Sequence, residues 1–218
     1  MTSKPSILIT AGPTHEPVDA VRYIANRSSG RMGIALAEAA ASRGSSVTLL
    51  LGPTPSAPPH HSQIRVRRFR TTADLQGLLA DLWPEHSILI MAAAVADYRP
   101  SKPADHMEKR PRQQGRWTLE LEATPDLLAE AAAASRPDQV TVGFALGPPD
   151  RLLDTARDKL RAKHIDAIVA NGLRTMGDDR IQATLILRDG REISRPECPK
   201  REFADWLLEQ VELLRVGR

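Results

Sequence analysis

The sequence contains little of several residue types, and each shortage excludes a class of protein. Its single cysteine, Cys198, cannot form a disulfide within the chain, which favours a reducing compartment. Aromatic residues make up only 4% of the chain, too few for the platforms on which single-stranded nucleic acids stack. Every apolar run is too short to cross a bilayer, and the first of them is too short for a signal peptide. We therefore expect a cytoplasmic protein that binds neither membranes nor nucleic acids.

An excess of one charge is also missing. Thirty lysines and arginines against 27 acidic residues leave a net charge of +3, which gives no electrostatic reason for binding a polyanion. The chain of 218 residues is 41% hydrophobic and 26% charged, as is typical of a folded protein with a buried core. Because no linker or internal repeat divides the chain, we predict one domain over residues 1–218.

Apolar runs alternate with helical patterns along most of the chain. This alternation predicts strands at 6–12, 46–52, 64–70, 87–93, 139–145 and 166–171, and helices at 31–43, 71–83, 124–135 and 150–164. Thr124 is the expected N-cap of the third helix, with Pro125 in its first turn. The end of the chain differs, because a hairpin at 181–195, turning at Asp189-Gly190, precedes an amphipathic helix at 200–215.

Nearly continuous apolar strands separated by helices are typical of a parallel sheet covered on both faces. We therefore predict a doubly wound, Rossmann-like α/β fold, with a mostly parallel sheet and a C-terminal β-hairpin. One segment, residues 94–117, contains no convincing helix or strand, and loops of this length are most often functional. We expect a mobile flap at about residues 98–116, with a disordered insertion as the alternative.

Familiar ligand-binding motifs are missing as well. No G-x-G-x-x-G follows the first strand and no acidic residue ends the second, which argues against an NAD(P)-dependent reductase. A P-loop is absent, and none of the six histidines has the partner spacing of a metal site. In an open parallel sheet the ligand lies beyond the carboxyl ends of the strands. What remains is a phosphate or nucleotide site built from loop backbone, Ser, Asn, Lys and Arg.

The string "NRSSGRMG", at residues 26–33, leads into the first helix. A helix start exposes unpaired N–H groups and a partial positive charge, so an anion is a natural ligand there. Glycine lets the backbone approach such a ligand closely. The alternative interpretation is that Ser28 or Ser29 is an N-cap and Gly30 a turn residue.

Five motifs in order carry a resemblance to a known family. They are "ITAGPTHEPVDAVRYIANRSSGRMG", "AAAVADYRP" followed by a basic loop, "TLELEATPDLL", "VGFA" and "ARDKLRAKHIDAIVAN". The chain, from about Ile7 to its C-terminus, closely resembles phosphopantothenate–cysteine ligase of the bacterial type. In many bacteria this domain is fused behind a flavin-dependent decarboxylase. The sequence contains only the ligase-like part, and we therefore expect a stand-alone ligase with a separate decarboxylase as partner.

The resemblance implies a nucleotide-dependent ligation in coenzyme A biosynthesis. The carboxylate of 4′-phosphopantothenate attacks the α-phosphate of CTP or ATP, with Mg²⁺ on the phosphates, and the amine of cysteine then displaces the nucleotide from the acyl-nucleotidylate. Such an enzyme must hold two anions together and exclude water, which calls for cations and backbone N–H groups rather than a nucleophilic side chain. The resemblance also implies a homodimer.

Matching motif positions give each candidate residue a role. Asn26 matches an asparagine at the carbonyl of the acyl intermediate, Arg22 an arginine near the same site, and Lys109 a lysine of the flap. We expect the Asn26 amide N–H₂ and the Lys109 ammonium to stabilise the oxyanion that forms when cysteine attacks. The nucleotide and its phosphates are expected to contact Gly12, Ser28, Ser29, Gly30, Ala92, Ala93, Asp97, Phe144, Lys159 and Lys163.

Other interpretations of these residues stay open. Asn26 fits a turn, Arg22 a contact between subunits, and Lys159 with Lys163 a solvated helix face. Three positions also depart from the family pattern. The chain reads "GFALGPPD" where a glutamate is usual, "ANG" in place of Ala-Asn-Asp, and "EKRPRQ" with one lysine in the flap. The missing glutamate keeps a second function open, a catalytically inactive partner subunit that binds nucleotide.

Overall fold

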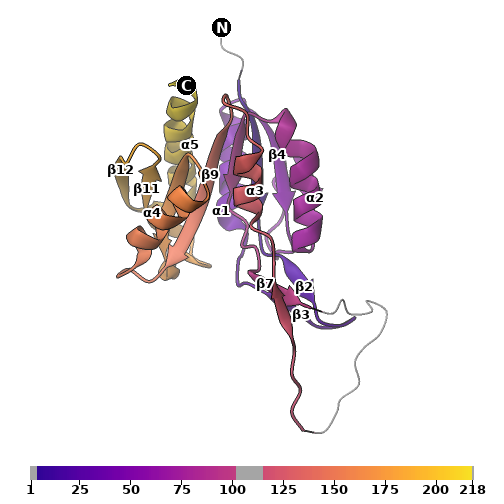
Figure 1. Cartoon of the computed structure of the whole chain (residues 1–218). Coiled ribbons are helices and arrows are strands. Elements are labelled where there is room, and N and C mark those ends of the chain that lie inside the picture. Colours follow the sequence, from indigo (N-terminus) through magenta and orange to yellow (C-terminus); the bar gives the residue numbers. More distant parts are fainter. Residues whose placement is uncertain (1–3, 102–114, 218) are drawn as a thin grey trace.

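The computed structural model describes residues 4–101 and 115–217. Its centre is an eight-stranded sheet in the spatial order β12-β11-β10-β9-β6-β1-β4-β5 (Figure 1). In chain order these strands are β1 (Ser6–Ala11), β4 (Ser46–Leu51), β5 (Ile64–Arg68), β6 (Ile88–Met91), β9 (Val140–Gly147), β10 (Ala167–Gly172), β11 (Arg180–Leu187) and β12 (Glu192–Pro199). The first six are parallel, whereas β11 and β12 add as an antiparallel hairpin. The predicted mostly parallel sheet with a C-terminal hairpin is confirmed.

Helices cover both faces of the sheet. They are α1 (Arg31–Ser42), α2 (Thr72–Leu82), α3 (Leu127–Ala133), α4 (Leu152–Ala162) and α5 (Lys200–Val216), with short 3₁₀ turns η1 (Trp83–Glu85) and η2 (Leu173–Thr175). One buried cluster joins α1 and α5 to the sheet, and a second joins α2, α3 and α4 to the opposite face (Figure 1). This arrangement is the doubly wound architecture that the alternating pattern predicts.

The central strand shows why the apolar runs lack alternation. Ile7, Leu8 and Ile9 of β1 are all fully buried, and they point alternately into the two clusters. A strand with helices on both faces needs apolar side chains at every position. The predicted edge strand at 64–70 is β5, which pairs on one side only and alternates in burial.

One helix start differs from the expectation, and a second begins as expected but without the alternative serine cap. Thr124 does not cap α3, because its hydroxyl donates to the carbonyl of Ala96 and its N–H to that of Asp97. Asp126 is the N-cap instead, and its carboxylate accepts from the N–H of Ala129. At α1 the N-cap is Gly30, with φ 72° and no side-chain cap, so capping by Ser28 or Ser29 is also wrong.

Two small two-stranded ribbons lie in segments where the sequence pattern predicts no strand. β2 (His15–Pro17) pairs with β3 (Tyr23–Ala25), and β7 (Tyr98–Pro100) with β8 (Leu121–Ala123), all below the carboxyl edge of the sheet in Figure 1. Three-residue strands are too short to show a period of two in the sequence. The start of the predicted flap is therefore β7, while residues 102–114 lie outside the described residues. No helix of residues 4–101 and 115–217 is long and apolar enough to span a membrane.

Candidate functional site

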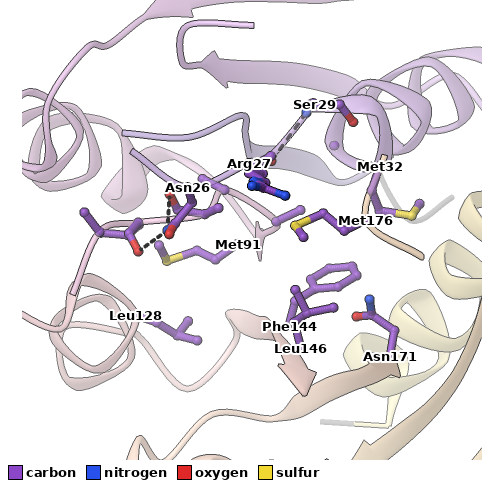
Figure 2. Close-up of a pocket in the computed structure, with 18 of the residues that line it drawn as sticks. Asn26, Arg27, Ser29, Met32, Met91, Leu128, Phe144, Leu146, Asn171 and Met176 are labelled. Carbon is purple, nitrogen blue, oxygen red and sulfur yellow. Dashed lines mark hydrogen bonds between the residues drawn. The ribbon is translucent and has the colours of Figure 1, made fainter. Parts of the chain in front are cut away.

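A cavity of about 820 Å³ opens at the carboxyl ends of β6, β9 and β10, beside the N-terminus of α1. It is lined from these strands by Met91, Phe144, Leu146 and Asn171, and Figure 2 shows Ser29 and Arg27 on the side opposite Phe144. The position is the one expected for a ligand of an open parallel sheet. The volume is in the range of pockets that enclose a ligand of nucleotide size.

One wall of this cavity is formed by the segment that leads into α1 and by its first residues. Residues 26–33 line it, and the start of α1 offers main-chain N–H groups that no side chain caps. The carbonyl of Ser29 accepts from Thr54 Oγ1 at 2.5 Å and from Ser56 Oγ at 2.9 Å, so the loop after β4 holds this segment in place. Uncapped N–H groups at the positive end of a helix favour an anion. We call residues 26–33 the backbone wall.

Two glycines let the backbone wall approach the sheet. A Cβ on Gly33 would lie 2.4 Å from Cβ of Ala11 and 3.0 Å from the carbonyl oxygen of Thr10. Gly12 does not line the cavity as expected but lies behind the wall, where its N is 3.4 Å from the position of a Cβ on Gly30. Gly12 therefore supports the predicted cradle from behind and does not contact the cavity.

Asn26 connects the backbone wall to the loop after β6. Its Nδ2 donates to the carbonyls of Ala94 at 3.3 Å and Val95 at 3.1 Å (Figure 2). Both protons of this amide therefore have acceptors, in contrast to the free donor that we expected. Ala92 and Ala93 line the cavity, although their N–H groups donate to Thr10.

The opposite wall consists of side chains. Phe144 and Leu146 project from β9, and Asn171 from the end of β10 donates to Thr175 Oγ1 at 2.6 Å. Met176 lies next to them at the same side of the cavity (Figure 2). Leu146 is 42% exposed in the cavity lining, so this wall presents an apolar surface to a ligand.

Cations line the cavity beside α4. Lys159 is exposed, and no ion pair is recorded for it among the described residues. Lys163, one helical turn on, pairs with Asp126 at 2.6 Å. Burial opposes ionisation of Asp126, but hydrogen bonds from Lys163 and from the Ala129 N–H outweigh burial and hold its pKa below the ordinary value. Lys159 is thus the lysine of this pair that is available to an anionic ligand.

Three cations of the lining, Arg27, Arg31 and Lys200, escaped the sequence analysis. Arg31 is the first residue of α1, and its guanidinium donates to the Gly177 carbonyl and to Asp179. Lys200 is the first residue of α5 and is buried, with contacts to residues 175–179. Arg27 and Arg31 both stand within the quoted motif of residues 26–33, which was a signal for them. Nothing in the sequence around Lys200 connects it with this cavity.

Only one of the three remaining predicted residues, Asp97, is found at the cavity. Asp97 is exposed and lines the cavity. Arg22 does not line it, because it projects from the β2–β3 turn, where it pairs with Asp19 at 3.4 Å and lies 5.7 Å from the ring centre of Trp117. Lys109 lies outside the described residues. Among residues 4–101 and 115–217, no three His, Cys, Asp or Glu side chains group as metal ligands.

An open parallel sheet, an uncapped helix N-terminus and lysines around one cavity define an α/β protein built to bind an anionic small molecule. Residues 2–214 match the family model described as the DNA/pantothenate metabolism flavoprotein C-terminal domain, so the chain belongs to that family. The crystal structure of the C-terminal domain of the coenzyme A biosynthesis bifunctional protein CoaBC is similar, with a TM-score of 0.82 and 32% identity. That comparison covers 98% of this chain and 97% of that one.

The chain is also similar in sequence to curated proteins. The chain is 36% identical over 212 residues to the coenzyme A biosynthesis bifunctional protein CoaBC of Bacillus subtilis, covering 95% of this chain and 51% of that protein. It is 42% identical over 181 residues to a prokaryotic protein named cysteine/cysteine sulfinic acid decarboxylase, covering 81% of this chain and 49% of that one. The chain therefore spans about half the length of these relatives.

Proposed function

We propose that this chain is a phosphopantothenate–cysteine ligase of coenzyme A biosynthesis. It joins 4′-phosphopantothenate to L-cysteine through an acyl-nucleotidylate, at the expense of CTP or ATP. The observation that carries the proposal is the cavity itself, in which the uncapped N-terminus of α1 faces the side chains of β9, β10 and α4. Membership of a family whose relatives include a coenzyme A biosynthesis protein supports it.

The first half-reaction brings two anions together, the substrate carboxylate and the α-phosphate. The N–H groups at the start of α1 and the hydroxyls of Ser28 and Ser29 bind phosphate oxygens on one side. Lys159 neutralises charge from the α4 side. Such preorganised donors act without reorganisation when pyrophosphate leaves. The apolar side chains of Phe144 and Leu146 keep water from the mixed anhydride.

In the second half-reaction the neutral amine of cysteine attacks the acyl carbonyl. The developing oxyanion needs a donor, and the amide protons of Asn26 are already directed at Ala94 and Val95. We therefore assign the oxyanion to Lys109 of the flap and give Asn26 the task of holding the loop of residues 92–97 at the site. For Arg22, which does not line the cavity, we propose the alternative role given above, a contact between subunits.

Mg²⁺ accompanies the triphosphate. Mg²⁺ is usually held by one or two carboxylates together with substrate phosphates, and does not need a full set of protein ligands. The exposed carboxylate of Asp97 in the cavity lining fits this requirement, whereas Asp126 is paired with Lys163. When bound, the ion would neutralise the charge that develops on the phosphate oxygens.

We also propose a cytoplasmic homodimer and a decarboxylase as functional partner. Exposed apolar side chains on the two ribbons, among them Tyr23 at 50% and Tyr98 at 57%, support a contact between copies. One curated relative, which is named a decarboxylase and of which the match covers 49%, supports the decarboxylase partner.

A pyrophosphate-release assay tests the function. The purified protein is incubated with 4′-phosphopantothenate, cysteine, Mg²⁺ and either CTP or ATP, and the product is identified by mass spectrometry. We expect release that requires phosphopantothenate, with CTP the better substrate. A folded protein that binds the triphosphate but releases no pyrophosphate would instead be the inactive partner subunit.

The two half-reactions are separated by variants. Lys109→Gln should still release pyrophosphate once and then accumulate the acyl-nucleotidylate, because only the oxyanion of the second step has lost its donor. The loss of one such donor typically lowers the rate by about 10²–10³. Asn26→Asp should impair both steps, since a carboxylate would face the carbonyls of Ala94 and Val95. Accumulation of the intermediate in Asn26→Asp, with normal turnover of Lys109→Gln, would contradict this division of roles.

A further inference from the structure

The segment that follows β10 closes one side of the cavity. We call residues 173–179 the wall segment, and three of them, Thr175, Met176 and Gly177, line the cavity. Its apolar side chains do not anchor it, because Leu173 is 52% exposed and Met176 is 42% exposed. Polar contacts must therefore hold the wall segment against the site.

The largest share of these contacts comes from one residue, Lys200, at the start of α5. Its side chain is buried, and its ammonium donates to the carbonyl of Thr175 at 2.9 Å and to the carbonyl of Asp178. Its main-chain N–H also donates to the carbonyl of Asp179, at 2.9 Å. One residue outside the segment thus holds three of its carbonyls.

The other tethers are weaker. Arg31 donates to the Gly177 carbonyl and to Asp179, but the side chain of Arg31 is 46% exposed and that of Asp179 is 84% exposed. Exposed pairs of this kind contribute little to stability. Lys200 is only 8% exposed, so its charge-assisted hydrogen bonds are shielded from water. Burial, with a smaller contribution from Arg31, lowers the pKa of Lys200 below its ordinary value.

We propose that Lys200 is a positioning residue of the ligase site: it holds the wall segment in contact with the bound substrate. The substrate's identity rests on the proposed function above. Without the ammonium, the carbonyls of Thr175 and Asp178 turn to water. The segment then keeps the main-chain N–H of residue 200, the exposed Arg31 contacts, the Asn171 hydrogen bond to Thr175, and local bonds to residues 172 and 180. A wall that touches the substrate equally in the ground and transition states affects KM and leaves kcat unchanged.

The kinetic test compares Lys200→Met with Arg201→Met, the same kind of change at the adjacent, exposed position of α5. We expect Lys200→Met to raise KM for at least one of the three substrates about tenfold, with kcat within about threefold of wild type. Arg201→Met should change neither, and Lys200→Arg should restore part of the affinity. A merely structural lysine would lower kcat through loss of folded enzyme at unchanged KM, and that result, or an unchanged KM and kcat, overturns the proposal.

A second test needs no substrate. Arg174 lies within the wall segment and is exposed, so trypsin reports how often the segment opens. Cleavage after Arg174, followed by mass spectrometry, should be about tenfold faster in Lys200→Met than in Arg201→Met or wild type. If Lys200→Met does not fold, Lys200→Gln takes its place. Equal cleavage rates in the three proteins would show that Lys200 does not tether the segment and would overturn the proposal. If the cleavage rates differ as expected but the wild type does not catalyse the ligation, only the proposed function is overturned.

Discussion

The two walls of the cavity are built in different ways. The backbone wall of residues 26–33 depends on glycines that bring α1 against β1, whereas the opposite wall presents side chains such as Phe144 and Lys159. The backbone wall has no room for an added atom at Gly33, because a Cβ there would overlap Ala11. The side chains of the opposite wall end in the open cavity, so one of them can be replaced without a clash with the rest of the protein. Substitutions in the backbone wall should therefore affect folding and binding together, while those in the opposite wall should affect binding alone.

The largest effect is expected for Gly33→Ala. The new Cβ would lie 2.4 Å from Cβ of Ala11 and 3.0 Å from the Thr10 carbonyl oxygen, so α1 must move away from β1. Overpacking of this kind typically costs about 1–3 kcal/mol. We expect the free energy of unfolding, measured by urea denaturation, to fall by about this amount, and CTP affinity, measured by calorimetry, to fall more than tenfold.

Gly77→Ala is the matched control. Gly77 lies within α2, where an added Cβ meets nothing within 4 Å. This change should raise the free energy of unfolding by about 0.4–1 kcal/mol, because alanine restricts the unfolded chain and favours the helix. CTP binding should not change. Equal behaviour of the two variants would show that the close approach of α1 to β1 is not required.

The second largest effect on stability and binding is expected for Gly30→Ala. Gly30 has φ 72°, and a left-handed conformation costs an alanine about 1–2 kcal/mol. Gly44→Ala, just past the other end of α1, imposes the same strain at φ 84° but lies away from the cavity. Both variants should therefore lose similar stability in thermal unfolding, and only Gly30→Ala should weaken CTP binding. If Gly44→Ala also lost CTP binding, backbone strain at either end of α1 would be enough to weaken binding, and the position of Gly30 at the cavity would not matter.

The backbone wall was largely predictable from the sequence. Gly30, Ser28 and Ser29 stand together in one string before a helix, so their shared role follows from local pattern. The apolar run of β1 and the Asp189-Gly190 turn were predictable for the same reason, because burial on both faces and a positive φ at Gly190 leave local signatures.

Contacts between distant segments were not predictable in this way. Lys200 reaches Thr175 across 25 positions, and no spacing rule connects a helix start with a loop before a hairpin. Thr124 had every local feature of an N-cap, but its hydrogen bonds to residues 96 and 97 move the cap to Asp126. Tertiary contacts overrode the local preference there, and the roles of Asn26 depend on the same kind of long-range pairing.

The opposite wall is tested by Lys159→Met. Because Lys159 is exposed on α4 and lines the cavity, we expect CTP affinity to fall about tenfold, near the lower range for a hydrogen bond to a charged group, without loss of thermal stability. Arg161→Met is the control, since Arg161 pairs with Asp158 at 2.6 Å and does not line the cavity. Equal weakening by both variants would indicate that only the overall charge of α4 matters.

The smallest effect concerns Asp126, which caps α3 and pairs with Lys163. Its pKa is lowered from the ordinary value of 3.8, so the folded state gains stability from the ionised carboxylate at pH above 3.8 and loses it as pH falls through the lowered pKa. Asparagine is an equally good N-cap, so Asp126→Asn removes mainly the charge. The carboxylate is 48% exposed and screened, and we expect a loss of only about 0.2–1 kcal/mol at pH 7 that is smaller at pH 3, below the ordinary pKa of the carboxyl group. Urea denaturation at both pH values measures it, and in a Lys163→Met background the pH-dependent difference should shrink, because the pairing cation is gone. A difference that grows as the pH falls would mean that the ionised carboxylate opposes folding, which contradicts the pairing seen here.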